Sequence, residues 1–559
     1  MSLPWHIPLE GLSKSKGKGD GVQPTALKHY SNLCVHDNPC EELQMGLMCD
    51  IGMHNKEPVM IQRLIAAGMT IARLAIRDLE PEVCSQLVQS VREAVYSYSV
   101  DLKFIYPLAV VVDIQNPQIV TGELKGGPDA TVELLENEII RLTTGTGWSR
   151  CGTAERLYVG WENLTKLHQG DLIFIDSLTP GIVTLVVSEV GEISVECVVS
   201  TGGTIGSKMT VRLSQVPLEV DSVPSSACSD GLQQSLQHIE GQIAWAVGSD
   251  VDALLIANVQ TAQDIRHVRS ILTSKGKENV LTLASIDTVL GIDNIQDIID
   301  EANGIYLDRT LLSTDLPVEK VFIAQKLIMA KCMEKGKPCI CKAVINEQVP
   351  TLCMTDIANL VLDGADVLSF EFYFDSSVKK LAPSYEPLRM AEQCLIAAGI
   401  VCRQAERILW QPQMYGNLEL TQTPLEEPTK AICISAVELA MRSRASVIIC
   451  LTNSGRTAKL LAQVRPTRPV VAVTRLCHTA RQLRFWRGVR SLHYFDEPSK
   501  DWSKEIDCRI QSAVDYCKIK RILRTGDAYI VLNGSRRGVG YCDSVRLLYA
   551  SSLDVVPVT

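Results

Sequence analysis

The chain has 559 residues, of which 46% are hydrophobic, 21% are charged and only 5% are aromatic. This length predicts roughly three or four domains with well-buried cores. Lysine and arginine total 55 against 64 aspartates and glutamates, a net charge of −9, so the basic surface that nucleic-acid binding needs is lacking. The short basic run from Ser13 to Lys18 lies beside glycines and is typical of a solvated arm.

No stretch approaches the ~18 consecutive apolar residues that a membrane span needs, and the N-terminus has no apolar run typical of a signal peptide. We therefore expect a cytoplasmic protein with no membrane partner. The 19 cysteines are scattered through apolar segments, as at Cys49 and Cys450, which is typical of buried reduced thiols. Cys339 and Cys341 share one face of a predicted strand, but no further ligand lies nearby, so we expect no thiolate-bound metal.

Eight short runs rich in β-branched residues recur along the chain, and amphipathic segments such as Glu57–Ala67, Thr261–Ser274 and Asp356–Asp363 lie between most of them. This alternation predicts parallel strands joined by helical crossovers, closed into a (β/α)₈ barrel with its chemistry at the carboxyl ends of the strands. The predicted strands are Gly46–Ile51, Thr70–Ile76, Pro107–Asp113, Val251–Asn258, Val280–Ile286, Asn303–Asp308, Pro338–Val344 and Ala365–Phe372.

The spacing of these units breaks once, between the third and fourth strands. Alternating patterns there, at Asp171–Asp176, Ile182–Glu189 and Ile193–Val199, predict an inserted antiparallel β domain. A proline-rich linker then precedes a second α/β region with predicted strands Ser446–Thr452, Val470–Arg475, Ser491–Phe495 and Asp527–Asn533. We expect an N-terminal arm (1–45), the barrel (46–117 and 235–410), the inserted domain (118–234), the linker (411–429) and a C-terminal α/β domain (430–559).

Long motifs, all in the same order, resemble those of the pyruvate kinase family: Gly68–Arg73 (GMTIAR), Pro317–Lys326 (PVEKVFIAQK), Asp356–Asp366 (DIANLVLDGAD), Ala472–Arg475 (AVTR) and Thr479–Gln482 (TARQ). A barrel interrupted after its third strand by a β domain and followed by an α/β domain also resembles that family. The resemblance runs from about residue 45 to the C-terminus.

The resemblance implies an activity, because pyruvate kinases transfer the phosphoryl group of phosphoenolpyruvate to ADP and protonate the enolate to pyruvate. Phosphoryl transfer depends mainly on positioning and on neutralising charge. In the family, the charge is neutralised by a magnesium ion held by two carboxylates, a potassium ion, an arginine and a lysine. We therefore looked for these groups in the matching positions of this chain.

The positions that match the family's lysine and magnesium ligands are changed. The family's KIEN motif corresponds to SIDT at residues 285–288, so Ser285 stands in the lysine position and the shorter Asp287 in the glutamate position. The aspartate of the family's ARGDLG motif corresponds to Leu311, and leucine offers no oxygen to a hard cation. Asp308 lies three residues upstream and is expected to face elsewhere. Asp287 is thus the candidate metal ligand that remains.

Most positions that match the family's potassium and substrate contacts are changed as well. Arg73 and Asp113 match the family, but other residues stand where potassium, nucleotide or enolate contacts are expected: Ala75, Arg77, Ile114, Val120 and Ala343. Arg77 offers a guanidinium charge as an alternative to the potassium ion, and residues 371–375 replace the family's SGETA loop. The sequence predicts remnants at Arg73, Asp113 and Asp287, no intact catalytic site, and no required magnesium or potassium.

The C-terminal domain keeps more of the family's pattern. Hydroxyls, backbone N–H groups and an arginine predict a phosphate cradle where a strand leads into a helix, at Thr452, Asn453, Ser454, Gly455, Arg456 and Thr457. The resemblance implies that this loop matches the TxSGRS loop that binds a phosphate of fructose 1,6-bisphosphate, with Trp502, Arg509 and a glycine-rich loop containing Gly538 at the other phosphate. The structural alternative is a helix cap at Thr452 or Ser454 and a core position for Trp502.

Three functions stay open at this point. The first is a non-catalytic pyruvate-kinase-like protein acting as a structural or regulatory subunit, in a homo-oligomer such as a tetramer, in a mixed oligomer with an active paralogue, or in a large assembly such as a cytoskeletal array. The second is a residual enzyme that uses Arg73, Asp113, Asp287 and Asp308. The third is a sugar-bisphosphate sensor.

Overall fold

The structure is a computed structural model. It describes residues 25–52, 55–74, 81–102, 104–114, 119–127, 130–161, 164, 166–178, 182–213, 230–345, 350–370, 386–410, 428–538 and 540–551. The chain divides into two compact units, one of Met1–Ala75, Glu82–Val111 and Met329–Thr559 and the other of Ile76–Pro81 and Val112–Ile328. Among the described residues, no helix is both long and apolar enough to cross a membrane.

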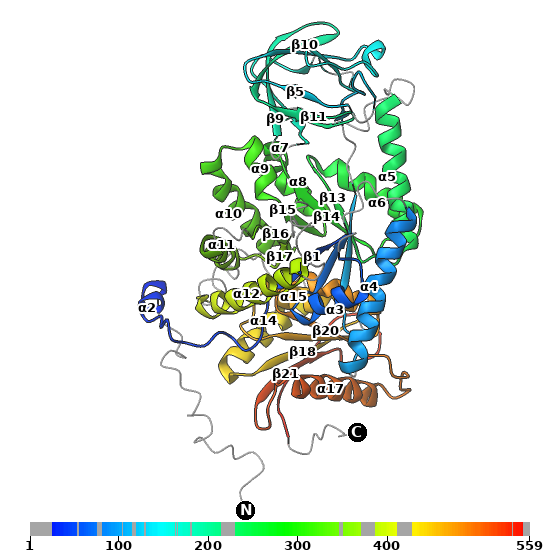
Figure 1. Cartoon of the computed structure of the whole chain (residues 1–559). Helices are drawn as coiled ribbons and strands as arrows, with labels where there is room; N and C mark the ends of the chain where they lie inside the picture. Colours follow the sequence, from blue (N-terminus) through cyan, green and yellow to red (C-terminus); the bar gives the residue numbers. More distant parts are fainter. Residues whose placement is uncertain are drawn as a thin grey trace, which may run out of the picture. The chain divides into compact units, whose positions relative to one another are not determined.

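Eight of the described strands form the barrel: β1 (Gly46–Ile51), β2 (Ile71–Leu74), β3 (Ala109–Ile114), β13 (Ala253–Ile256), β14 (Leu281–Ile286), β15 (Gly304–Leu307), β16 (Cys339–Ala343) and β17 (Val367–Phe370). They close in the order β1-β17-β16-β15-β14-β13-β3-β2, which confirms the predicted (β/α)₈ fold (Figure 1). Most of their residues are buried, since both faces of a barrel strand are covered, and this explains the continuous apolar runs in the sequence.

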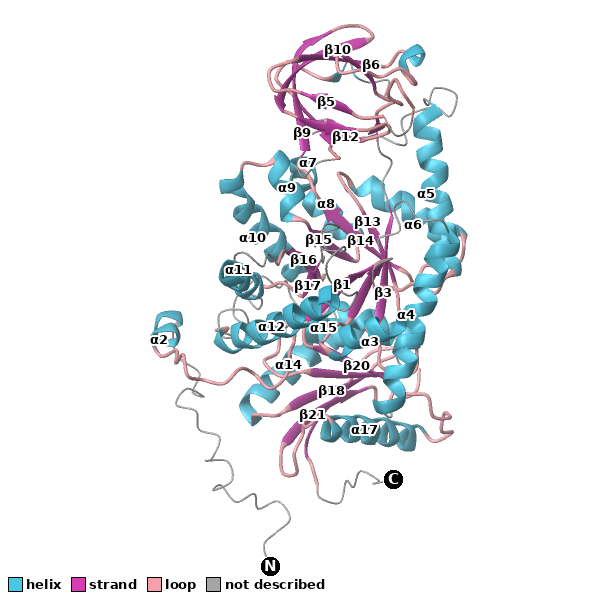
Figure 2. Ribbon diagram, viewed as in Figure 1, coloured by secondary structure: helices cyan, strands magenta, loops and turns pink. Residues whose placement is uncertain are grey.

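Helices follow most of the barrel strands (Figure 2). The predicted helix at Thr261–Ser274 is observed as α6, and its start is fixed by a capping box in which Thr261 and Asp264 bond each other's backbone N–H groups. The other helices of this part of the chain are α3 (Pro58–Ala66), α4 (Pro81–Leu102), α5 (Asp230–Gly248), α7 (Val289–Asp293), α8 (Ile295–Glu301), α9 (Arg309–Asp315), α10 (Val318–Lys335), α11 (Pro350–Asp363) and α12 (Glu386–Ile408).

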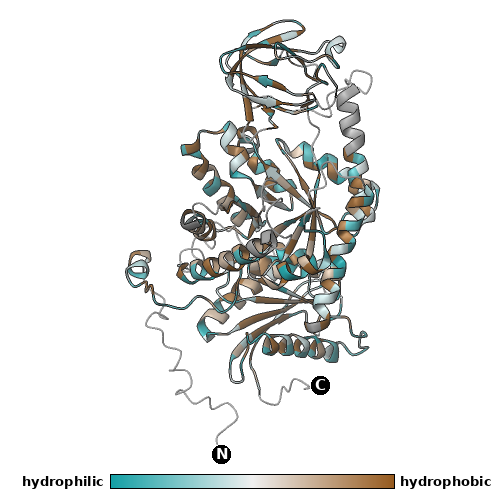
Figure 3. Cartoon of the chain, viewed as in Figure 1, coloured by the Kyte–Doolittle hydropathy of each residue, from teal (hydrophilic) through white to brown (hydrophobic). Residues whose placement is uncertain are grey.

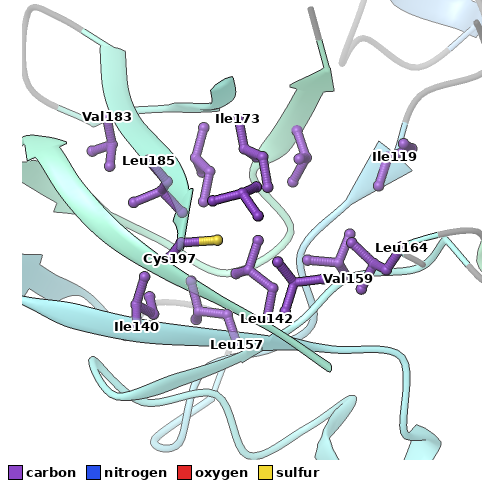
Figure 4. Close-up of a cluster of buried hydrophobic side chains, with 14 of the residues drawn as sticks. Ile119, Ile140, Leu142, Leu157, Val159, Leu164, Ile173, Val183, Leu185 and Cys197 are labelled. Carbon is purple, nitrogen blue, oxygen red and sulfur yellow. The ribbon is translucent and has the colours of Figure 1, made fainter. Parts of the chain in front are cut away.

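The predicted antiparallel insertion is also observed. Its described strands are β4 (Ile119–Val120), β5 (Val132–Leu134), β6 (Ile139–Thr143), β7 (Arg156–Tyr158), β8 (Leu172–Asp176), β9 (Ile182–Val190), β10 (Ser194–Thr201), β11 (Gly203–Ile205) and β12 (Thr210–Leu213). Alternate residues of β9 and β10 point into one apolar core, which Figure 4 shows around Leu142, Leu185 and Cys197.

The C-terminal region is a five-stranded sheet in the order β20-β19-β18-β21-β22 within its described part. Its apolar strands appear brown in Figure 3, in line with their burial. The sheet comprises β18 (Val447–Leu451), β19 (Val470–Thr474), β20 (Val489–His493), β21 (Ala528–Asn533) and β22 (Ser544–Tyr549), and its helices are α14 (Pro428–Ser443), α15 (Arg456–Gln463), α16 (Cys477–Gln482) and α17 (Trp502–Ile519).

One strand prediction in this region needs correction, and one strand was missed. The strand predicted at Ser491–Phe495 is β20, which begins two residues earlier and pairs with β19 from Val489 to His493. Aromatic residues at 494 and 495 resemble strand formers, but they follow the last pair of the ladder. The antiparallel edge strand β22 was not predicted, because its residues are only partly buried and carry no strong alternation.

Candidate functional site

The candidate barrel site contains a buried carboxylate that accepts two hydrogen bonds from the protein. Asp287 directly follows β14, and it is 5% exposed, as is Ser285. The Ser285 hydroxyl donates to Asp287 Oδ1 at 2.7 Å, and the backbone N–H of Asn258 donates to Oδ2 at 2.9 Å. Both oxygens of the candidate metal ligand therefore accept hydrogen bonds from the protein itself. Sequence reasoning missed Asn258, although it lies just after a strand end, at β13.

Burial raises the pKa of Asp287, and the negative charge of Asp308 raises it further. The hydrogen bonds from Ser285 and Asn258 oppose this shift, because they stabilise the ionised carboxylate. The pKa of Asp287 is raised overall, so the two neutral donors offset only part of the cost of burying its charge, at a position where the family resemblance implies a lysine and a divalent cation.

The second magnesium position does not supply a ligand. Leu311 lies in the first turn of α9, and Asp308 caps that helix by accepting from the N–H groups of Thr310 and Leu311 at 3.0 and 3.2 Å. Within the described part of the chain, no group of three His, Cys, Asp or Glu side chains is placed to hold a metal ion.

The remaining predicted barrel residues lie in both units. In the second unit, Asp113 and Ile114 are buried at the end of β3, and Val120 lies on β4. In the first unit, Ala343 is buried at the end of β16.

The guanidinium of Arg73, in the first unit, lies 3.3 Å from the carboxylate of Asp50. Sequence reasoning missed Asp50, which lies near the carboxyl end of β1. Ala75, Arg77 and residues 371–375 fall outside the described residues.

The C-terminal loop at 452–457 connects β18 to α15. The Thr452 hydroxyl accepts from the N–H of Gly455 at 3.0 Å, which closes a turn, and the Thr474 hydroxyl donates to the carbonyl of Asn453 at 3.2 Å. Thr457 is buried behind the loop, whereas Asn453, Ser454 and Arg456 are exposed. The start of the helix therefore lies at the protein surface.

Gly455 is needed for this turn, because its φ is +80°. An added Cβ would lie 3.1 Å from Leu483 Cδ2 and 3.2 Å from Thr479 Cγ2. We expect Gly455→Ala to lower the free energy of unfolding by about 2 kcal/mol, through left-handed strain and crowding. Urea unfolding measures this, with Gly526→Ala as the control, since its φ is +91° but its Cβ meets nothing within 4 Å. Equal losses in both variants would show that crowding at Gly455 contributes nothing.

Arg509 is held in a buried charge cluster with Glu505 and Arg475. Its Nε donates to Glu505 Oε1 at 2.7 Å, and Arg475 donates to the same oxygen from Nε and Nη2 at 3.0 and 2.6 Å. The guanidinium of Arg509 also lies 5.8 Å from the ring centroid of Trp502. Two arginines thus share one carboxylate, which leaves a net positive charge. Sequence reasoning missed Glu505, although its spacing four residues before Arg509 is the usual helical ion-pair signal.

Burial alone would raise the pKa of Glu505, but hydrogen bonds from Ser499, Arg475 and Arg509 lower it to about 2. A folded-state pKa below the unfolded value of about 4.3 stabilises the native state above that pH and loses this contribution as pH falls toward 2. We expect wild type to lose roughly 2 kcal/mol more stability than Glu505→Gln between pH 6 and pH 3. Urea unfolding measures the free energy of unfolding of both proteins at each pH. An equal loss in wild type and Glu505→Gln would contradict the assignment.

The glycine-rich loop begins beside the 452–457 loop. β18 and β21 are parallel neighbours with Cys450 opposite Leu532, so both loops begin at the carboxyl ends of adjacent strands. Trp502 Nε1 donates to the carbonyl of Gly534 at 3.2 Å, which ties this loop to the start of α17. Gly538 has a φ of +81° in the exposed part of the loop. Trp502, the two loops and Arg509 therefore belong to one region of the C-terminal sheet.

Comparisons with known proteins agree with the observed architecture. The family described as "Pyruvate kinase, barrel domain" matches residues 43–371, and "Pyruvate kinase, alpha/beta domain" matches residues 430–548. The chain is 30% identical to "Pyruvate kinase PKLR" of Rattus norvegicus over 534 residues, covering 94% of this chain and 88% of that protein. It is 29% identical to "Pyruvate kinase" of Schizosaccharomyces pombe, covering 92% and 96%, and 28% identical to that of Leishmania mexicana, covering 93% and 99%.

Proposed function

Because the chain belongs to the pyruvate kinase family, we propose that it has lost phosphoryl transfer from phosphoenolpyruvate to ADP and serves as a structural or regulatory subunit. The observation that carries this proposal is the hydrogen bond between Ser285 and Asp287. In the position that resembles the family's catalytic lysine stands a neutral hydroxyl, which donates to Asp287, the residue in the position of a magnesium ligand.

The size of the expected loss supports the proposal. Removing one preorganised charge from an active site typically costs ~10²–10³ in rate. Here a lysine position and a magnesium-ligand position are both neutral, at Ser285 and Leu311. Such losses do not add simply, yet together they leave little catalysis of a reaction that depends on neutralising phosphate charge. On this proposal the chain requires neither magnesium nor potassium.

A second candidate function is a sugar-bisphosphate sensor. The observation that favours it is the exposed 452–457 loop beside the glycine-rich loop, with excess positive charge from Arg475 and Arg509 nearby. A residual pyruvate kinase is the remaining alternative, and it would use Arg73, Asp113, Asp287 and Asp308. The need for a divalent cation separates the sensor from the residual kinase, because only the residual kinase requires such an ion at the barrel.

As partners we propose further copies of this chain or an active paralogue. We propose that they form a cytoplasmic assembly, for which a cytoskeletal array is one candidate. Exposed apolar side chains on α10, at Val318, Phe322 and Ile323, support association. We expect sedimentation velocity at micromolar concentration to show an oligomer, alone or after mixing with an active family member. A strict monomer under both conditions would contradict the subunit proposal.

The test of lost activity is a coupled assay with phosphoenolpyruvate, ADP, magnesium and potassium. The purified chain is expected to form no ATP above background, whereas an active family member run beside it reports full turnover. A residual kinase would instead show turnover that disappears when the divalent cation is chelated.

A further inference from the structure

An ion pair joins the carboxyl ends of two neighbouring barrel strands in the first unit. Asp50 on β1 and Arg73 on β2 lie opposite each other in the parallel ladder. Nη1 of Arg73 lies 3.3 Å from both Oδ1 and Oδ2 of Asp50, within hydrogen-bond distance. Functional side chains of (β/α)₈ barrels lie at this end of the strands. Arg73 matches the arginine that, by the family resemblance, neutralises phosphate charge, and here it faces a carboxylate of the chain itself.

The two charged side chains are removed from most of the solvent. The side chain of Arg73 is 9% exposed and that of Asp50 is 17% exposed. The other residues of β1 are buried, so Asp50 is the position of this strand that solvent still reaches. Opposite charges attract more strongly where water is excluded, and a charge left there without a partner is costly. The guanidinium of Arg73 therefore has a compensating negative charge before any ligand arrives.

Asn55 fixes the backbone that follows Asp50. Nδ2 of Asn55 donates to the carbonyl of Asp50 at 2.9 Å, and the N–H of Gly52 donates to Asn55 Oδ1 at 2.7 Å. The N–H of Asn55 donates in turn to the carbonyl of Gly52 at 3.2 Å, and Asn55 is itself only 6% exposed. Strand pairing holds the backbone before Asp50, and this turn holds the backbone after it. The carboxylate is therefore positioned in advance, so little conformational entropy is lost when it pairs with Arg73.

We propose that Asp50 determines which ligands this end of the barrel accepts, because its carboxylate pairs with Arg73 and excludes phosphate monoesters. This inference rests on the proposed loss of phosphoryl transfer and names a residue that maintains it. An anion that approached Arg73 would lie beside a negative charge in partly buried surroundings, where like charges repel strongly. It would also have to displace a partner that is already in position. Arg73 is thus retained as the partner of Asp50, and it does not act as an anion-binding residue.

Removing the charge of Asp50 tests the proposal. Asp50→Asn keeps the shape of the side chain but leaves the guanidinium of Arg73 without this compensating charge, which a phosphate group can then supply. Because a hydrogen bond to a charged group is worth at least a factor of ten in affinity, we expect the variant to bind phosphoenolpyruvate at least about tenfold more tightly than wild type. Calorimetry on the full-length chain measures this, without ADP and with EDTA present so that no divalent cation contributes.

Two further variants locate the binding. Asp50→Asn combined with Arg73→Gln is expected to lose the gain in affinity, which separates the barrel from any phosphate binding at the 452–457 loop. Glu392→Gln is the matched control, because it breaks another ion pair of the same unit, with Arg63, and is expected to keep the affinity of wild type. Equal affinity of wild type and Asp50→Asn would overturn the proposal. A gain that survives Arg73→Gln, or that Glu392→Gln reproduces, would overturn it as well.

A second substitution covers the case in which Asp50→Asn does not fold. Asp50→Thr removes the same charge and places a β-branched residue, which suits a strand, on β1. We expect its thermal midpoint to lie below that of wild type and to rise with phosphoenolpyruvate, which binds only the native state. If neither variant folds, the ion pair serves stability alone and the proposal is wrong.

The coupled assay distinguishes the failure of this inference from the failure of the proposed function. ATP formation by wild type would contradict the proposed function. Binding of phosphoenolpyruvate by wild type that depends on Arg73, without any turnover, would contradict only the role of Asp50.

Discussion

In a coupled assay with saturating phosphoenolpyruvate, ADP, magnesium and potassium, the purified chain is expected to turn over at least about 10⁴-fold more slowly than an active family member. The physical reason is the absence of charge where the phosphoryl group would sit. Ser285 is neutral and is bonded to Asp287, and Leu311 offers no oxygen. Turnover within a hundredfold of the active enzyme would contradict the proposed loss of function.

Restoring two residues sharpens this test. We expect Ser285→Lys combined with Leu311→Asp to leave the chain inactive, because Ala75, Arg77 and the 371–375 segment still differ from the family. The matched control is Ser285→Ala, which removes the hydrogen bond to Asp287 without adding a charge. Comparable thermal midpoints for the control and the double variant would show that inactivity does not come from misfolding. Substantial recovery of turnover would mean that the changes at Ser285 and Leu311 alone had abolished the activity.

The barrel was predictable because several features of the sequence indicate the same alternation of strands and helices. Strands buried on both faces, such as β3 and β13, are short apolar runs with little ambiguity, and helices of ordinary length separate most of the barrel strands. The amphipathic segment predicted at Thr261–Ser274 is observed as α6. What escaped prediction was β22, because an edge strand whose residues are half-buried carries no clear pattern. The end of β20 differed for another reason, because the aromatic residues at 494 and 495 resemble strand formers but follow the last pair of the ladder.

The candidate site was predictable only in part. Matching motifs identified Ser285, Asp287 and Leu311 as changed positions, but sequence could not show that Ser285 and Asn258 satisfy Asp287, since these contacts depend on three-dimensional register. In the same way, motif matching named Arg509 as a phosphate ligand and missed that Glu505 already binds it. Hydrogen bonds and ion pairs between the residues of a site depend on the fold, so a sequence motif alone does not reveal them.

Fructose 1,6-bisphosphate is expected to stabilise the chain through the C-terminal loops. We expect hydroxyls and N–H groups at 452–457 to contact one phosphate, and the guanidinium groups of Arg475 and Arg509, which share Glu505, to attract the other. With micromolar affinity, a ligand at ~1,000 times its dissociation constant adds about 4 kcal/mol to the free energy of unfolding, because it binds only the native state. A rise in thermal midpoint and heat in calorimetry measure this.

Three variants separate the contributions to that shift. Arg509→Ala is expected to abolish it, whereas Arg73→Ala, at the barrel, leaves it unchanged. Because Arg509→Ala also breaks the buried pair with Glu505, Glu505→Gln is the matched control: it disrupts the same pair but keeps the guanidinium, so the ligand shift should persist. Loss of the shift in Glu505→Gln would mean that the pair only shapes the pocket. If millimolar ligand gives wild type neither shift nor heat, the loops are retained for stability, and the structural-subunit proposal stands without a sensor role.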